Sequence, residues 1–249
     1  MANFISGAPQ WAVILFIPAF LYSIFFITKS AKMAALSTGM TPGQSRNIQL
    51  GIFGFYFIYL VYASILALNG LLDVDSLPPR AMVWAGIPLA VILFGFIGNT
   101  RLFKRLLHAI TLESLIKIHI FRVVGVFFLV LYCYHLLPAK FAFFAGMGDI
   151  ITAIFSYPVA KMVANRQRGW KIVVYIWSVF GVMDIIDLLV IAVTTGANGN
   201  LREMAIFPFV WFPAFAPATI LFLHTSVFRK LYQEQNSSQA NRFGQLIKQ

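Results

Sequence analysis

Seven apolar stretches of about 20 residues constrain this chain more than any other feature. A helix rises about 1.5 Å per residue, so a stretch of this length crosses the ~30 Å hydrocarbon core of a bilayer. Only 11% of the 249 residues are charged, against about 25% in soluble domains. We therefore predict an all-α, multi-pass membrane protein with transmembrane helices at residues 9–28, 47–70, 80–99, 114–137, 141–163, 170–195 and 205–228.

The spans form one predicted domain, residues 1–232, followed by a polar tail at 233–249. Basic residues gather in the first, third and fifth connections and in the tail: Lys29, Lys32, Arg46, Arg101, Lys104, Arg105, Lys117, Lys161, Arg166, Arg168, Lys171, Arg229, Lys230, Arg242 and Lys248. The opposite connections hold only Arg80, Lys140 and Arg202. Because positive loops stay in the cytoplasm, we expect the N-terminus outside, the C-terminus inside, and a bacterial cytoplasmic (inner) membrane.

The net charge of +11 is spread over these short loops. Such a distribution is explained by membrane orientation and does not indicate a nucleic-acid partner. Residues 100–113 combine an apolar stripe (Leu102, Phe103, Leu106, Leu107 and Ile110) with cations on other faces. This pattern predicts a short interfacial helix, and a cytoplasmic extension of the fourth span is the alternative.

Cysteine and motif content excludes several chemistries. The single cysteine, Cys133, allows no disulfide within the chain and no cysteine-based metal site. We find no phosphate-binding glycine loop and no cluster of metal ligands. The first apolar stretch lacks a basic segment before it and is followed by basic residues, so we interpret it as a retained span and not as a cleaved signal peptide.

Ionisable residues inside the spans are the main candidates for function. Arg122 lies in the fourth span, Asp149 in the fifth, and Asp184 and Asp187 in the sixth. A charge near the bilayer centre costs about 2.5–3.5 kcal/mol on insertion scales, and pairing with an opposite charge is the usual remedy. We predict a buried polar cluster in which Arg122 pairs with Asp149, Asp184 or both. It serves either to hold the helices together or to bind and move a ligand.

Small and polar residues follow one face of the fifth span. Thr152 and Ser156 share this face with Asp149, and Gly146 and Gly148 lie beside them. Small residues let neighbouring helices approach closely. We therefore expect Asp149 to point into the bundle and Gly125, Gly146 and Gly148 to serve helix packing.

Two histidines and several prolines complete the candidate set. His119 and His224 are predicted at similar depth, as two axial ligands of a b-type haem would be, although hydrogen-bonded or interfacial histidines are the favoured interpretation. Otherwise we expect no cofactor. Pro213 and Pro217 in the last span, with Pro208 before them, predict a kink, because proline removes a helical hydrogen bond.

Gly146 to Asp149 match the Gly-x-Gly-Asp pattern of intramembrane aspartyl proteases, with Asp184 as a second carboxylate. The other motifs of that family are missing. Arg122 would also hold both carboxylates ionised, whereas a catalytic dyad shares a proton. Proteolysis is therefore a remote alternative, as is haem-based redox chemistry.

Two segments carry a resemblance to a family. Arg122, Gly125, Pro138, Phe141, Ala142, Ala145, Gly146, Gly148 and Asp149 form an Arg-x-x-Gly … Leu-Pro-x-x-Phe-Ala-x-x-Ala-Gly-x-Gly-Asp pattern. A second pattern runs through Phe207, Pro208, Pro213, Phe215, Pro217 and His224. Both resemble a group of uncharacterised bacterial multi-pass membrane proteins. The resemblance implies no activity.

Two classes of function remain. In the first, the cluster lines a path, and the chain is a small-solute or proton-linked transporter with Asp149 as the titrating group. In the second, the cluster locks the fold, and the chain is a non-catalytic sensor or an accessory subunit of a membrane complex. An enzyme is the less favoured interpretation. The expected partners are membrane lipid and either another membrane protein or a second copy of the chain.

Overall fold

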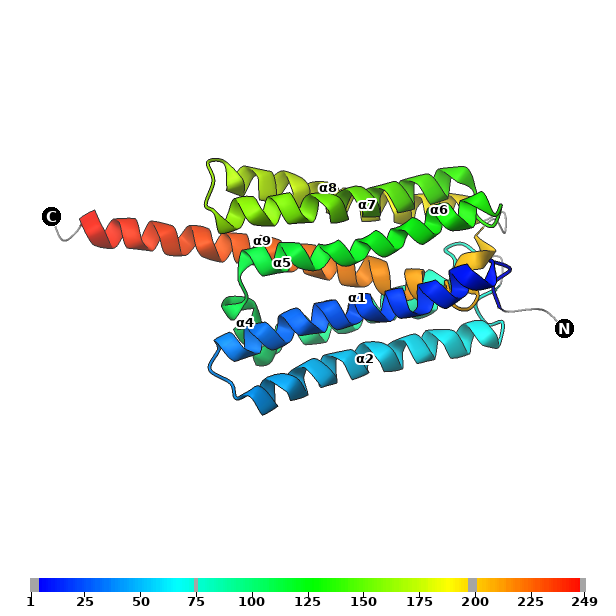
Figure 1. Cartoon of the computed structure of the whole chain (residues 1–249), viewed down its shortest axis with the longest axis horizontal. Helices are drawn as coiled ribbons and strands as arrows, with labels where there is room; N and C mark the ends of the chain where they lie inside the picture. Colours follow the sequence, from blue (N-terminus) through cyan, green and yellow to red (C-terminus); the bar gives the residue numbers. More distant parts are fainter. Residues whose placement is uncertain (1–4, 74–75, 197–200, 247–249) are drawn as a thin grey trace.

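The structure is a computed structural model that describes residues 5–73, 76–196 and 201–246, and these residues form helices and no strand. Seven helical rods are long and apolar enough to cross a membrane, which suggests a multi-pass membrane protein. They lie lengthwise beside one another (Figure 1). Five rods are single helices: α1 (Gln10–Ser37), α2 (Pro42–Leu68), α7 (Ala139–Ala164), α8 (Trp170–Gly196) and α9 (Trp211–Leu246). The third rod is made of η1 (Met82–Gly86), α3 (Ile87–Ala90), η2 (Val91–Phe96) and η3 (Ile97–Asn99). The fourth rod is made of α5 (Leu112–Ile118), η4 (His119–Gly125) and α6 (Val126–Cys133).

The first and last rods differ from the predicted spans. α1 continues past residue 28 to Ser37 and stops before Gly39, whose φ of 82° suits a helix C-terminus. The last rod begins at Trp211 instead of residue 205, because Arg202–Ala205 form the short helix η5 and Pro208 lies in the following turn. α9 then continues as one helix through polar residues as far as Leu246.

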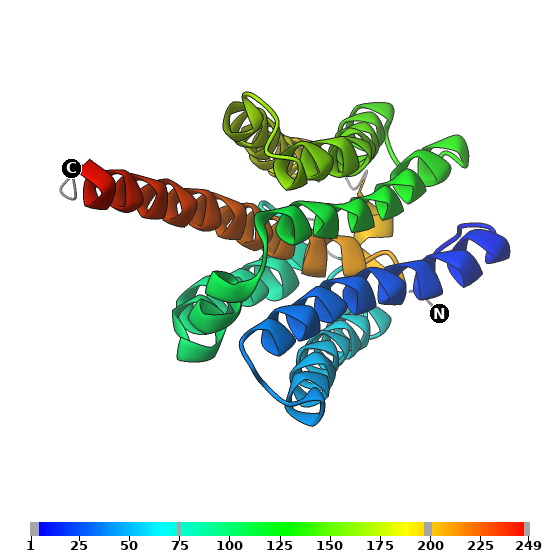
Figure 2. The same cartoon turned by 60° about the vertical axis from the view of Figure 1, so that its left-hand side comes forward.

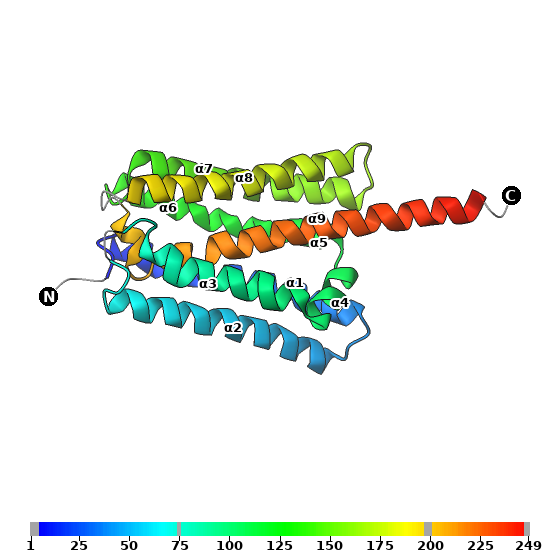
Figure 3. The same cartoon turned by 180° about the vertical axis from the view of Figure 1, so that it is seen from behind.

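The two ends of the bundle differ in charge. The α1–α2 turn, α4 (Arg101–Ala109), the α7–α8 turn and the C-terminal part of α9 lie at the end where the basic connections fall (Figures 1 and 3). We call it the basic end. The described N-terminal residues, the α6–α7 connection and η5 lie at the other end, the N-terminal end. There Ser6 donates to a carboxylate oxygen of the buried Glu203 at 2.5 Å.

α4 (Arg101–Ala109) falls within residues 100–113, where the amphipathic pattern predicts a short helix, and it ends before α5 begins at Leu112. The hydroxyl of Thr100 caps it by accepting from the Phe103 amide at 3.1 Å. Its apolar stripe faces the bundle through buried Leu106 and Leu107, whereas Leu102 is exposed. Arg105 donates to the Thr38 carbonyl at 3.1 Å, which ties α4 to the end of α1.

α9 is the central rod, because its membrane-length segment is more buried than any other of the seven. Near the N-terminal end, its aromatic side chains pack on Phe16 and Phe20 of α1, both buried. Phe16 contacts the rings of Phe20 on α1 and Phe127 on α6. It also contacts Phe209 in the turn before α9, and Trp211 and Phe212 at the start of α9. This aromatic cluster fixes α9 against α1 and α6.

The prolines of the last rod occupy different positions. Pro213 lies in the first turn of α9, where a backbone N–H has no acceptor within the helix, so proline removes no helical hydrogen bond there. Pro217 lies inside the helix and cannot donate to the Pro213 carbonyl four residues earlier. That carbonyl lies against Gly86 of η1, where an added Cβ would be only 2.8 Å from the oxygen. The proline–glycine pairing therefore brings α9 and the third rod into close backbone contact.

Replacing Phe16 with alanine should destabilise the protein strongly, because it empties the centre of the aromatic cluster. Removal of a buried phenylalanine costs about 3–5 kcal/mol. We expect a clear drop in Tm for the purified protein in a fixed detergent. Phe25→Ala on the same helix removes a ring that is 44% exposed and should leave Tm near the wild-type value. Equal effects of the two substitutions would contradict the packing described here.

Candidate functional site

Arg122 is fully buried in the middle of the fourth rod and joins three rods. Its Nε–H donates to Oδ1 of Asp149 on α7 at 2.7 Å, and its Nη2 donates to Oδ2 of Asp184 on α8. The side chains of the two aspartates are 5% and 10% exposed. One guanidinium thus pairs with both Asp149 and Asp184, where the sequence predicted pairing with one of them or with both.

The local helix type explains how the fourth rod presents these groups. η4 is a 3₁₀ helix, in which residues three apart eclipse one another. His119, Arg122 and Gly125 therefore line up along one side of the rod. At the end of this line, a Cβ on Gly125 would lie 2.5 Å from the Cβ of Asp149.

Two further glycines leave room for charged side chains. An added Cβ on Gly148 of α7 would fall 1.5 Å from Oδ1 of Asp184, and one on Gly181 of α8 would fall 2.3 Å from Nε2 of His224. Gly146 serves a different contact, because its position faces Leu129 and the Gly125 carbonyl. Gly125 and Gly148 therefore leave room for the carboxylates of Asp149 and Asp184, in addition to allowing the helices to pack closely.

His224 of α9 extends the ion pairs toward the basic end. Its Nε2 lies 3.4 Å from Nη1 of Arg122, and its Nδ1 lies 3.3 Å from the Ser178 hydroxyl of α8. We call Arg122, Asp149, Asp184 and His224 the Arg122 cluster. The His224 ring also packs against the His119 ring, with centroids 4.1 Å apart and planes tilted by 39°.

His119 is buried beside this cluster without a hydrogen-bond partner for either ring nitrogen. Trp177 of α8 packs against both histidine rings and donates its indole N–H to the Thr152 carbonyl at 3.2 Å. The Thr152 hydroxyl is also buried and unpartnered. These groups extend the polar interior of the bundle past His224.

The polar face of α7 is buried as its spacing predicts. Asp149, Thr152 and Ser156 all lie in the interior. The Ser156 hydroxyl donates to the Ala153 carbonyl at 2.6 Å on its own helix. The Ser156 hydroxyl is therefore satisfied within α7, whereas the Asp149 side chain pairs with another rod.

Asp187 does not belong to the buried cluster, which corrects the prediction from the sequence. It is exposed on the outer surface of α8, and no ion pair found within residues 5–73, 76–196 and 201–246 includes it. Each step of three residues turns a side chain by about 60° around an α-helix. Asp184 already lies at the edge of the buried stripe of α8, so Asp187, one step further, lies outside it. Asp184 and Asp187 instead border a groove of about 420 Å³ between α7 and α8 that is otherwise lined by apolar residues and Gly148.

Trp177, Ser178 and Gly181 were not identified from the sequence as site residues. A signal for two of them was present: Ser178, Gly181 and Asp184 recur every three residues, so they lie near one face of a helix. Trp177 carried no comparable signal, because an apolar aromatic in a span is usually packing.

The cavity beside Asp149 is small. It has a volume of about 30 Å³ and is walled by apolar side chains that include Phe128, Phe141 and Phe212. A space of this size holds about one water molecule. In this conformation, Asp149 is thus closed off on that side.

The charge count of the cluster defines its chemistry. Two carboxylates pair with one guanidinium. The cluster therefore contains one carboxylate more than is required to neutralise the charge of Arg122. One carboxylate can take up a proton while the other still pairs with the arginine, which stays charged. The arrangement can therefore bind and release one proton in the interior of the bundle.

Two other chemistries fit the geometry poorly. A haem iron bound by both His119 and His224 would lie between their rings, and rings in direct contact leave no room for a porphyrin. Asp149 and Asp184 each bond to a nitrogen of Arg122, whereas a protease dyad requires a shared proton between carboxylates. Within the described ranges, no group of three or more His, Cys, Asp or Glu side chains could hold a metal ion.

Gly148→Ala tests the close fit around the cluster. The new methyl group would overlap the carboxylate of Asp184, so α7 or α8 must shift, at a cost of about 1–3 kcal/mol. We expect a lower Tm and lower membrane abundance. Gly54→Ala on α2 is the control, since its Cβ would meet nothing within 4 Å. If both substitutions left Tm unchanged, Asp184 could not be packed on Gly148 as described.

A family model described as a domain of unknown function (DUF8737) matches residues 77–232. The matched region contains every member of the Arg122 cluster and begins after α2. No curated protein and no solved structure matches the chain. Because the match covers more than half of the sequence, the chain belongs to the DUF8737 family.

Proposed function

We propose that this protein is a proton-linked transporter of a small solute, set in a bacterial cytoplasmic membrane with its basic end in the cytoplasm. The observation that carries the proposal is the single buried guanidinium paired with two carboxylates. Ionisable groups within spans are rare and expensive and mark proton and substrate pathways. The surplus carboxylate supplies the site for the transported proton.

The neighbouring histidines support a path toward the basic end. Along α9, His224 lies about 20 Å from Trp211 at 1.5 Å per residue, which is just over halfway along the membrane-length segment Trp211–Gln235. From the carboxylates, titratable groups continue through His224 to His119. A series of this kind suits a proton relay.

The way in which the rods are joined supports a switching mechanism. Both carboxylates lie on the hairpin of α7 and α8, whereas Arg122 and His224 lie on η4 and α9. Figure 2 shows this hairpin on one side of the bundle, away from α1 and α2. A proton that neutralises one carboxylate weakens the link between the hairpin and Arg122. The hairpin can then move against the other rods and open the closed cavity beside Asp149 to one side of the membrane.

A second candidate is an accessory subunit of a membrane complex, and Asp187 favours it. An exposed carboxylate within a span is costly in lipid. A partner helix that brings a basic residue to the α7–α8 groove would remove this cost. In that case, the Arg122 cluster serves only to hold the fold.

Reconstituted protein separates the two candidates. Liposomes that contain a pH-sensitive dye are given inward gradients of amino acids, carboxylates, sugars and monovalent cations in turn. We expect at least one gradient to drive proton movement with the wild-type protein, and Asp149→Asn and Asp184→Asn to abolish it at equal protein content. Asp187→Asn, on the same helix as Asp184 but outside the cluster, should retain it.

Two results would contradict transport. One is a wild-type protein that moves no protons above empty liposomes with any of these solutes. The other is a pair of asparagine variants that transport as the wild type does.

The proposed orientation is tested with single cysteines in a Cys133→Ser background. Gln167 lies exposed in the α7–α8 connection at the basic end, and Lys140 lies exposed at the N-terminal end. A membrane-impermeant maleimide added to intact cells with a permeabilised outer membrane should label Lys140→Cys. It should label Gln167→Cys only after the inner membrane is opened. The reverse pattern would place the basic end outside.

A further inference from the structure

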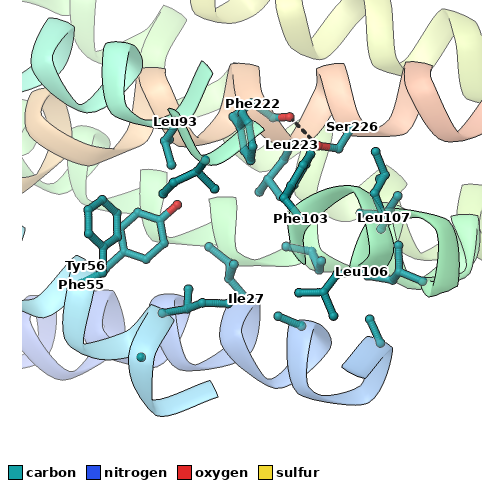
Figure 4. A pocket seen from close by; sticks show the side chains of 18 residues that line it. Ile27, Phe55, Tyr56, Leu93, Phe103, Leu106, Leu107, Phe222, Leu223 and Ser226 are labelled. Carbon is teal, nitrogen blue, oxygen red and sulfur yellow. Dashed lines mark hydrogen bonds between the residues drawn. The ribbon is translucent and has the colours of Figure 1, made fainter. Parts of the chain in front are cut away.

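A large apolar cavity lies on the other side of α5 and α9 from the Arg122 cluster. Its volume is about 370 Å³, within the range of ligand sites. Side chains from α1, α2, η2, α4, α5 and α9 converge on it (Figure 4). Ile118 and Leu223 line it, and the next residues, His119 and His224, belong to the polar interior. The cavity is thus separate from the proton site.

The lining admits only an apolar ligand. Tyr56 and Ser226 are the only polar side chains among the lining residues. The Ser226 hydroxyl already donates to the Phe222 carbonyl at 2.8 Å, as the dashed line in Figure 4 shows. A polar solute would lose its hydration here without compensation.

The cavity can be reached from the side of α2. Gly51, one of the lining residues, is exposed, and an added Cβ there would meet no atom within 4 Å. α2 bonds to the third rod nearer the N-terminal end, through Tyr59 to the Ala85 carbonyl at 2.5 Å and Tyr62 to the Trp84 carbonyl at 2.9 Å. The opening thus lies on the outer side of the membrane-length helix α2, toward the basic end.

The helix α4, which lines the cavity, also carries exposed cations. α4 contributes Phe103, Leu106 and Leu107 to the lining, while its Arg101 and Lys104 are exposed on other faces of this short helix. An apolar cavity bordered by cations at a bundle end is complementary to a molecule with an acyl chain and an anionic head.

We propose that this cavity binds the acyl chain of an anionic amphiphile, a phospholipid or a free fatty acid, whose head group pairs with the cations of α4. The chain enters past Gly51 and lies between α1, α2 and α4. The site requires no change in the Arg122 cluster and stands independently of proton transport.

Photo-cross-linking tests the site in the full-length protein. The protein is reconstituted in phosphatidylcholine vesicles with one of three probes that carry a diazirine on the acyl chain: phosphatidylglycerol, phosphatidylcholine or a fatty acid. We expect mass spectrometry to locate adducts of an anionic probe on cavity residues such as Phe55 and Leu106. Labelling should exceed that by the phosphatidylcholine probe by about fivefold per cation engaged.

Gly51→Phe, whose Cβ would meet no atom within 4 Å, should block the entrance and remove these adducts. Gly54→Phe, three residues further along α2, also meets open space but does not line the cavity, and it should label as the wild type does. Lys104→Gln should reduce the preference for the anionic probes.

The relative yields of the phosphatidylglycerol and fatty-acid probes identify the source of the chain, and either one supports the site. Equal labelling of wild type and Gly51→Phe, or adducts confined to residues outside the cavity, would overturn the proposal. Equal labelling by anionic and zwitterionic probes would overturn the role of the cations.

Discussion

The pairing of one arginine with two aspartates is the interaction on which the interior of this protein depends. A guanidinium inside an apolar bundle requires compensation, and removing one partner of a buried pair costs about 3–5 kcal/mol. The charge of Arg122 is compensated by Asp149 and Asp184, which lie on adjacent helices of one hairpin. Glycines at 125, 148 and 181 then follow as a steric requirement, because any side chain there would displace a member of the cluster. The charges thus determine how closely η4, α7, α8 and α9 pack.

This arrangement divides the molecule into parts with different roles. The α7–α8 hairpin is held to the rest through ion pairs as well as apolar packing, so its attachment depends on protonation. The contact of α1 with α9 and α6 is aromatic and is insensitive to pH. A proton-dependent movement would therefore involve the hairpin, while α1, α9 and α6 provide a fixed frame. The cavity near α4 lies on the frame side, where a bound acyl chain would add to packing.

Much of the fold could be predicted from the sequence, because apolar length and the cost of buried charge are local properties. The seven long apolar helices and the pairing of Arg122 with Asp149 and Asp184 follow from these two rules. The direction of Asp187 could not be fixed, since it depends on the rotation of α8 about its axis, which tertiary packing sets. The sequence also did not reveal that the fourth rod is wound as a 3₁₀ helix at His119–Gly125. The apolar cavity likewise depends on how α2 and α4 are placed.

The most direct measurement of the central claim, that the Arg122 cluster carries one exchangeable proton, is infrared difference spectroscopy of the reconstituted protein. Spectra recorded across a pH titration report the C=O band of a protonated carboxylic acid and require no knowledge of the solute. We predict a band that grows in the wild type as pH falls and is removed or shifted by both Asp149→Asn and Asp184→Asn, because the two carboxylates share one arginine. A spectrum that neither substitution changes would contradict the claim.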